Sequence, residues 1–207
     1  RISAMGLNRR QLLQWASLAP VAAATSLAVP SAFASPMNIS ARSGGLILPG
    51  QAPSTESHRT LKLHNLHTGE KAHVTYWEQG DYHVDALAEI FLLMRDHRAN
   101  SIAAIDIALL DQLHSVQDKL EVNREILLIS GYRSEKTNNM LRASSKGNGV
   151  AKRSLHMQGK AMDFRIAGTN LRQVHRATLA STQGGVGYYS RSGYIHMDTG
   201  RKRKWGL

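Results

Sequence analysis

Two short segments in the C-terminal half alternate between apolar and polar residues, and they restrict the fold more than any other feature. They are residues 161–166 (AMDFRI) and 194–198 (YIHMD). Because side chains point alternately to the two faces of a β-strand, each segment predicts a strand with one face in the core. The predicted core face holds Met162, Phe164, Ile166, Ile195 and Met197. The opposite face holds Asp163, Tyr194, His196 and Asp198. We therefore expect functional side chains on this second face.

Other periodicities extend these two strands into an α+β domain. Residues 59–66 and 72–77 alternate around a glycine-containing turn, which predicts a β-hairpin. Residues 82–95 and 102–120 have apolar residues at helical spacing and predict two amphipathic helices. Residues 125–130 (EILLIS) predict a buried strand. The order of the elements indicates an α+β fold in which helices pack on a small, mainly antiparallel sheet.

The first 34 residues have the composition of a secretory signal peptide. Arg9 and Arg10 precede an apolar stretch from Leu12 to Val29, and the small-residue pattern Ala32-Phe33-Ala34 follows it. The adjacent arginines indicate the twin-arginine export route. We therefore predict cleavage near Ala34 and a periplasmic protein that meets the membrane only during export. A retained membrane anchor is the alternative.

The segment between this leader and the hairpin is rich in Ser, Gly and Pro. Its residues, 35–57, lack periodicity and predict a flexible linker. Residues 58–207 are therefore assigned as one folded domain, which we expect to be a monomer.

The composition limits the chemistry that the chain can perform. No cysteine is present among the 207 residues, which excludes disulfides and cysteine-ligated zinc, so any metal must bind His, Asp or Glu. The net charge is +11, but the basic residues are scattered except at 201–204 (RKRK), without interleaved aromatic residues. We therefore expect no nucleic-acid partner. The charge predicts a solvated surface, with attraction to an acidic wall polymer as the alternative.

Three residues on or near the two C-terminal strands form a candidate zinc site. Asp163 and His196 occupy the polar faces of the strands, and His156 lies seven residues before Asp163. A fully extended chain would separate that pair by roughly 20 Å, so a turn is required, and Gly159 permits one. Two imidazoles and a carboxylate suit zinc, which keeps a fourth position for water in catalytic sites. On spacing alone, each histidine could equally be a surface or core residue.

Three motifs in order resemble the zinc D-Ala-D-Ala peptidases of the LAS group of metallopeptidases. Residues 154–164 (SLHMQGKAMDF) are similar to the S-x-H-x-x-G-x-A-x-D signature, and residues 130–134 (SGYRS) to the segment upstream. Residues 193–200 (GYIHMDTG) are similar to the closing His-x-Asp segment. Together with the leader and the hairpin at 59–77, the chain resembles the MepK-like murein endopeptidases. The resemblance implies a LAS/hedgehog-like fold. It also implies that zinc is bound by His156, Asp163 and His196.

The same resemblance implies a role for Arg133, and two residues near the motifs are further candidates for substrate binding. Arg133 is expected to contact the substrate or the developing oxyanion. Ser154 and Tyr194 are assigned to substrate binding, with a cap on the turn before His156 and simple packing as the respective alternatives. Many relatives place a glutamate three residues before the last histidine as the general base, whereas this chain has Gly193 there.

Another residue must then take the proton from the attacking water. Asp198 follows His196 by two residues on the same strand face, so we assign it as the general base. Orientation of the His196 imidazole is the alternative role. Glu135 is a weaker candidate because it is predicted to lie in a turn of no fixed direction.

These features together predict a zinc metallopeptidase, with residues 58–207 as its catalytic domain. Its expected partner is peptidoglycan. The enzyme would hydrolyse the peptide cross-links or stem peptides of this polymer during cell-wall growth. A non-catalytic peptidoglycan- or zinc-binding module on the same scaffold is one alternative, favoured by the missing glutamate. A D-Ala-D-Ala carboxypeptidase is the other. Both L,D and D,D cross-links are compatible with the motifs.

Overall fold

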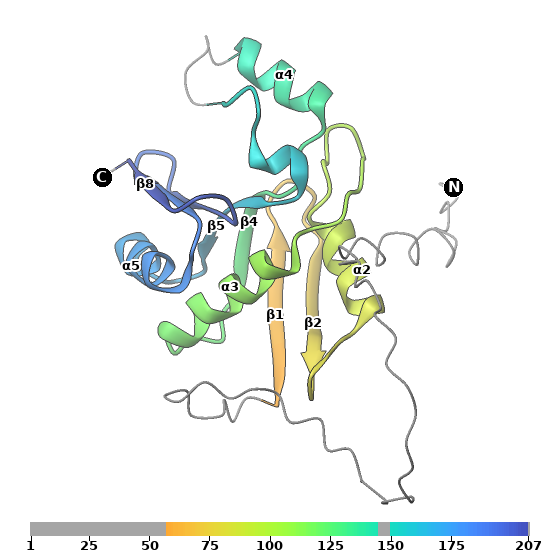
Figure 1. The fold of residues 1–207 in the computed structure, drawn as a ribbon, viewed down its shortest axis with the longest axis vertical. Helices are drawn as coiled ribbons and strands as arrows, with labels where there is room; N and C mark the ends of the chain where they lie inside the picture. The colour runs from red at the N-terminus through yellow and green to blue at the C-terminus, as the bar shows by residue number, and fades with distance from the viewer. Residues whose placement is uncertain (1–56, 145–149, 207) are drawn as a thin grey trace, which may run out of the picture. The chain divides into compact units, whose positions relative to one another are not determined.

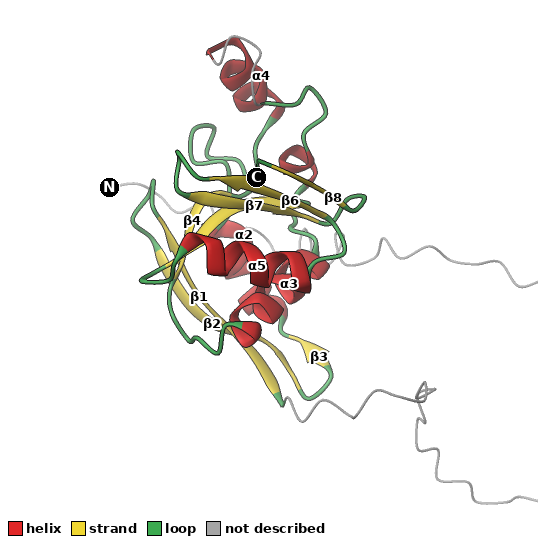
Figure 2. Cartoon of the chain, turned by 90° about the vertical axis from the view of Figure 1, so that its left-hand side faces the viewer, coloured by secondary structure: helices red, strands yellow, loops and turns green. Residues whose placement is uncertain are grey.

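Eight strands form one mixed sheet in the part of the chain that the computed structural model describes, residues 57–144 and 150–206. The sheet order is β3-β2-β1-β4-β5-β7-β6-β8, and the strands are labelled between Figures 1 and 2. The strands are β1 (His58–Asn65), β2 (Lys71–Glu78), β3 (Asp81–Tyr82), β4 (Ile126–Ser130), β5 (Ala161–Ile166), β6 (Gly185–Tyr189), β7 (Tyr194–Asp198) and β8 (Arg203–Trp205). The helices are α2 (Val84–Leu93), α3 (Ile107–Lys119), α4 (Glu135–Ser144), the 3₁₀ helix η1 (Leu155–Gln158) and α5 (Leu171–Ser181). The predicted signal peptide at 1–34 and the predicted linker, apart from Ser57, lie outside the described residues.

The hairpin expected at the start of the domain is confirmed. β1 and β2 pair antiparallel, with Leu63 opposite Ala72. β1 then extends the sheet by pairing in parallel with β4, where Leu63 lies beside Ile126. Leu61, Leu63 and Tyr76 are almost completely buried, as their place on the inward face of the hairpin predicts.

Helices α2, α3 and α5 cover the apolar face of this sheet, whereas α4 lies away from it (Figures 1 and 2). Asp106 precedes α3 as its N-cap, and its carboxylate accepts the Ala108 N–H at 3.1 Å. The helices and the inward strand faces share one hydrophobic core, in which Leu109 and Phe164 are fully buried. Among the described residues, no helix combines the length and the apolar composition needed to cross a bilayer.

The two C-terminal strands have the bounds and the faces that their alternation predicts. β5 and β7 pair antiparallel with Met162 opposite Met197, and both side chains are fully buried. Asp163 lies opposite His196 on the other face. The core therefore fixes which side chains of β5 and β7 are available for chemistry.

The α+β class and the mainly antiparallel pairing are confirmed, but the sheet, with eight strands among the described residues, is larger than expected. The hairpin and the C-terminal strands belong to one sheet, in which β1–β4 and β6–β8 are parallel pairs and the other five pairs are antiparallel. β6 and β8 were not predicted because their composition is atypical of strands. β6 (GVGYY) contains two glycines, and β8 lies in the basic tail, and both glycine and lysine are depleted in strands.

Candidate metal centre

Neighbouring strands place two of the three candidate ligands side by side. Asp163 on β5 and His196 on β7 are direct cross-strand partners, so their side chains leave the same face of the sheet. The third candidate, His156, lies on η1, which precedes β5. The chain therefore turns back between His156 and Asp163, as their separation in sequence requires.

Gly159 makes this turn possible. It has a φ of +66°, a left-handed conformation that glycine adopts without strain. A Cβ atom at this position would lie 2.1 Å from the carbonyl oxygen of Ala104, which excludes any larger residue without a shift of backbone. The turn predicted from Gly159 is therefore confirmed, and it positions η1 at the end of β5.

The SGYRS segment holds η1 in place from the other side. The backbone N–H of Arg133 donates to the His156 carbonyl at 3.1 Å, and the His156 Nδ1 lies 2.8 Å from the Gly131 carbonyl. A Cβ atom on Gly131 would lie 2.4 Å from the Met94 carbonyl, so glycine is needed where this segment passes the end of α2. Two motifs that are separate in sequence are thus hydrogen-bonded to each other.

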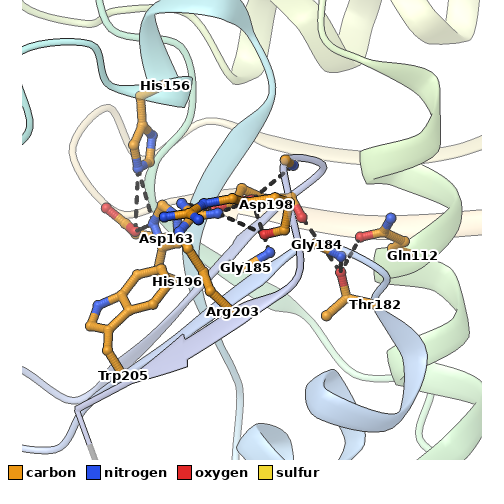
Figure 3. Close-up of polar contacts among 12 residues, drawn as sticks. Gln112, His156, Asp163, Thr182, Gly184, Gly185, His196, Asp198, Arg203 and Trp205 are labelled. Atoms are coloured by element: carbon orange, nitrogen blue, oxygen red, sulfur yellow. Dashed lines mark hydrogen bonds and ion pairs between the residues drawn. The ribbon is translucent and has the colours of Figure 1, made fainter.

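The three candidate ligands present their donor atoms at spacings that suit a tetrahedral metal ion (Figure 3). The distances are 2.8 Å from His196 Nδ1 to Asp163 Oδ1, 3.3 Å from His156 Nε2 to His196 Nδ1, and 3.4 Å from His156 Nε2 to Asp163 Oδ1. Zinc bonds of about 2.0–2.1 Å at tetrahedral angles place the ligand atoms about 3.3 Å apart. His156 and Asp163 are buried and His196 is half-buried, so the three atoms form a partly enclosed group.

Hydrogen bonds behind the two imidazoles select the nitrogen that faces this group. A carbonyl and a carboxylate only accept hydrogen bonds, so His156 Nδ1–H donates to Gly131 and His196 Nε2–H donates to Asp198 Oδ2 at 3.1 Å. His196 Nδ1 donates to Asp163 Oδ1 at 2.8 Å, and loss of that proton would leave His196 Nδ1 and His156 Nε2 with lone pairs available to a metal ion. Metal-binding histidines have this pattern, with the second N–H bonded to a carbonyl or carboxylate. The residues therefore fit a zinc ion by donor type, spacing and tautomer.

The charges of the group are strongly coupled. Burial alone would lower the pKa of His196, but hydrogen bonds to Asp163 and Asp198 and their charges raise it to about 9. Burial would raise the pKa of Asp163, but His156 and His196 hold it well below its usual range. A proton on His196 Nδ1 occupies the position where a metal would bind, so metal binding at neutral pH must release that proton.

Asp198 lies beneath His196 with no solvent exposure. Its Oδ2 accepts from His196 and from Arg203 Nη2 at 2.7 Å. Its Oδ1 accepts from the backbone N–H groups of Gly185 and Gly200, both at 2.9 Å, and from Arg203 Nη1 at 3.1 Å. All of the acceptor capacity of this carboxylate is therefore used within the protein.

An open cleft of about 310 Å³ lies over the candidate ligands. The three residues that the sequence analysis assigned to substrate binding, Arg133, Ser154 and Tyr194, all line it. Arg133 is almost buried, and its Nη2 lies 3.7 Å from Asp163 Oδ2. A larger hollow of about 700 Å³ between α3 and α5 has neither histidine nor aspartate among its lining residues, so size alone does not mark the site.

Two residues considered in the sequence analysis lie outside the cleft. Glu135 is exposed in the first turn of α4 and does not line the cleft. Gly193 has a φ of +73°, and a Cβ atom there would lie 3.8 Å from the Arg165 guanidinium. A side chain at position 193 would thus be strained and would start toward Arg165.

Arg203 and Trp205 line the cleft but were not proposed from the sequence, and Tyr189 lines it with them. Tyr189 stacks on Tyr194 with ring centroids 4.6 Å apart and accepts a hydrogen bond from Trp205 Nε1 at 3.0 Å. The Trp205 ring centroid lies 5.2 Å from that of His196. The available signal in the sequence was the spacing of Arg203 and Trp205, because residues two apart in a strand lie on the same face.

The described domain is α+β and presents a His–Asp–His donor group, of a kind that could hold a metal ion, beneath an open cleft. Residues 53–205 match the family model described as Peptidoglycan L,D-endopeptidase MepK. Peptidoglycan L,D-endopeptidase MepK of Escherichia coli (strain K12) is 47% identical over 165 residues, which cover 78% of this chain and 90% of that protein. The probable peptidoglycan L,D-endopeptidase MepK of Haemophilus influenzae is 41% identical over 153 residues, 73% of this chain and 81% of the relative. The chain therefore belongs to the peptidoglycan L,D-endopeptidase MepK family of peptidases.

Proposed function

We propose that this protein is a zinc-dependent endopeptidase that cleaves L,D peptide cross-links of peptidoglycan. The observation that supports it most is the convergence of His156 Nε2, Asp163 Oδ1 and His196 Nδ1 at spacings near those of a tetrahedral zinc site. The donor group lies where β5, β7 and η1 meet, so the sheet would hold the zinc ion. The names of the relatives favour L,D over D,D bonds.

Zinc in this position would activate a water molecule and polarise the scissile carbonyl. The chain supplies the remaining electrostatic stabilisation. Arg133 lies beside Asp163 at the edge of the donor group, where its guanidinium can stabilise negative charge on the carbonyl oxygen. Burial and the charge of Asp163 raise the pKa of Tyr194, so its hydroxyl stays protonated and can donate a hydrogen bond to the substrate.

We assign Asp198 to the orientation of His196, the second of the two roles that the sequence left open. The general-base role requires a carboxylate oxygen that can approach the attacking water. Asp198 has no exposed surface, and protein donors occupy both of its oxygens. Among the described residues that line the cleft, Asp163 is the only carboxylate.

The cationic character of the cleft favours a substrate with a free carboxylate. Arg153 is exposed on the cleft lining and, within the described residues, makes no hydrogen bond or ion pair. Peptide stems of peptidoglycan carry carboxylates, and a guanidinium binds a carboxylate through two parallel hydrogen bonds. We assign Arg153 to this contact.

Export to the periplasm follows from the proposed substrate. The segment that would direct it, residues 1–34, contains the adjacent Arg9 and Arg10. Replacement of both by lysine should leave the protein in the cytoplasm. Export of the double variant at the normal level would exclude the twin-arginine route and indicate the general secretory route.

Metal analysis and product analysis of the purified protein test the proposal. The wild-type protein should bind one zinc ion and convert defined L,D-linked dimeric muropeptides into monomers, identified by mass. A carboxypeptidase would instead release free D-Ala and leave dimers intact. A wall-binding module would retain purified sacculi without releasing soluble peptides.

Replacement of a ligand provides the link between metal and activity. His156→Ala should lose both zinc and turnover, because it removes one of three donor atoms. His73→Ala, which changes an exposed histidine on β2, is the matched control and should keep both. Zinc bound at one equivalent in both His156→Ala and His196→Ala would refute the assigned ligand set.

A further inference from the structure

The basic tail of the chain reaches the candidate metal centre through one residue. Arg203, on β8, places its guanidinium against the buried carboxylate of Asp198, with Nη2–Oδ2 and Nη1–Oδ1 distances of 2.7 and 3.1 Å (Figure 3). This is a bidentate ion pair, the geometry in which arginine binds a carboxylate most strongly. The Asp198 oxygen that accepts from Nη2 also accepts from His196. Arg203 is thus one residue removed from a candidate metal ligand.

The fold directs β8 to this position by pairing it in parallel with β6. Gly185 lies beside Arg203 and Gly187 beside Trp205. A Cβ atom on Gly185 would lie 2.6 Å from Arg203 Nη1, and one on Gly187 would lie 2.5 Å from Trp205 Cε2. The two glycines therefore leave the space through which Arg203 and Trp205 extend over β6 toward β7.

Because side chains alternate along β8, Arg203 and Trp205 lie on one face of the strand and Lys204 on the other. Arg203 and Trp205 line the cleft, whereas Lys204 lies between them in sequence, is exposed and does not line it. The Arg203 guanidinium also lies 5.1 Å from the centroid of the Trp205 ring, close enough for a cation–π contact. One face of β8 thus serves the site, and the other contributes positive charge to the surface.

We propose that Arg203 is a positioning residue for the metal centre, which acts through Asp198 to hold the His196 ring with Nδ1 directed at the metal. Arg203 contacts both oxygens of Asp198 and so fixes the orientation of its carboxylate plane. Asp198 then accepts the Nε2–H of His196 and selects the tautomer whose Nδ1 is free. The inference rests on the proposed zinc site, and it assigns the C-terminal strand to that site.

Zinc affinity of the purified protein, measured without substrate by competition with a chromogenic chelator, tests this proposal. Arg203→Gln should weaken zinc binding by about 10- to 100-fold, the usual effect of a residue that supports a metal ligand. Arg203→Lys keeps the charge but not the bidentate geometry, so its affinity should lie between those of wild type and Arg203→Gln. Lys204→Gln removes the same charge from the next residue of the strand and should bind zinc like the wild type.

A double variant separates positioning from a general effect on folding. If Arg203 acts only through Asp198, then Asp198→Asn with Arg203→Gln should bind zinc no more weakly than Asp198→Asn alone. This pair also removes both charges of the buried ion pair, so it folds without an unpaired buried carboxylate. The melting temperature of each metal-free variant, measured alongside, reports any general loss of stability.

The outcomes distinguish this inference from the proposed function. Wild-type protein that binds no zinc would refute the proposed function itself. Wild-type protein that binds zinc, with unchanged affinity in Arg203→Gln, would overturn only the role of Arg203. Fully additive losses in the double variant would also overturn it, because Arg203 would then act independently of Asp198.

Discussion

The Asp198→Asn variant distinguishes the two roles of Asp198 because an asparagine has one acceptor oxygen where aspartate has two. If the amide oxygen takes the place of Oδ1, the contacts to Gly185 and Gly200 persist. The amide NH₂ then faces the His196 Nε2–H, 3.1 Å away in the wild type. Two donors cannot share this contact, so the stable arrangement is the other imidazole tautomer, with the proton on Nδ1. Zinc has to displace that proton to bind.

The expected cost is a 10- to 100-fold loss of zinc affinity, which corresponds to about 1.4 to 2.8 kcal/mol. Turnover should recover when zinc is added in excess, because the cleft residues are unchanged. The assay is chelator competition for affinity, followed by cleavage of defined dimeric muropeptides at saturating zinc. If Asp198 were the general base, zinc affinity would persist and zinc-saturated turnover would fall by roughly 10² to 10⁴. That second pattern would refute the orienting role.

Three further predictions follow from contacts elsewhere in the domain. Arg153→Gln should raise the KM for peptides with a free carboxylate but not the KM for their amidated forms. Lys152→Gln, at the exposed neighbouring position, should change neither KM. An equal rise in KM for both substrates in Arg153→Gln would exclude a carboxylate contact. Gly159→Ala should lower the free energy of unfolding by at least about 1 kcal/mol, measured by denaturant titration, because position 159 has a positive φ and no space for a Cβ atom; unchanged stability would show that η1 can shift. Asp96 is buried, which alone would raise its pKa, but hydrogen bonds that include those from Ser134 lower the pKa to about 2. Because this folded-state pKa is below the unfolded value of about 3.9, Asp96 should add about 2 kcal/mol of stability above pH 4 that is lost as the pH falls toward 2, and Asp96→Asn should flatten this part of the stability–pH curve.

The parts of the fold that follow from sequence are those with a strong local period. β5 and β7 were predicted with their observed bounds because alternation of apolar and polar residues over five or six positions is typical of a half-buried strand and not of a helix or loop. The helix expected at 102–120 begins only at Ile107, since Asp106 caps it and the Asp106 N–H donates to the Gly159 carbonyl at 3.0 Å. Local pattern identified the element, and a distant contact set its start.

The glycine-rich strand β6 shows why the rest was not predictable. Val186 and Tyr188 alternate with Gly185 and Gly187, but glycine gives no hydrophobic signal, so the segment resembles a loop. Its glycines are explained only by β8, which pairs with it and places Arg203 and Trp205 against them. A residue whose function is to leave space can be interpreted only once the neighbour that fills the space is known.

The sequence by itself determined the candidate ligands and the sheet face that presents two of them. Asp163 and His196 follow from the period of two in β5 and β7, and His156 follows from its motif and from the glycine that permits a turn. Only the tertiary structure decided how the carboxylate of Asp198 is used. Its partners Gly185, Gly200 and Arg203 come from β6, the chain after β7, and β8, and no local pattern specifies which groups surround it. Whether a carboxylate can accept a proton from water depends on solvent access and on competing donors, and both arise when separate segments pack together.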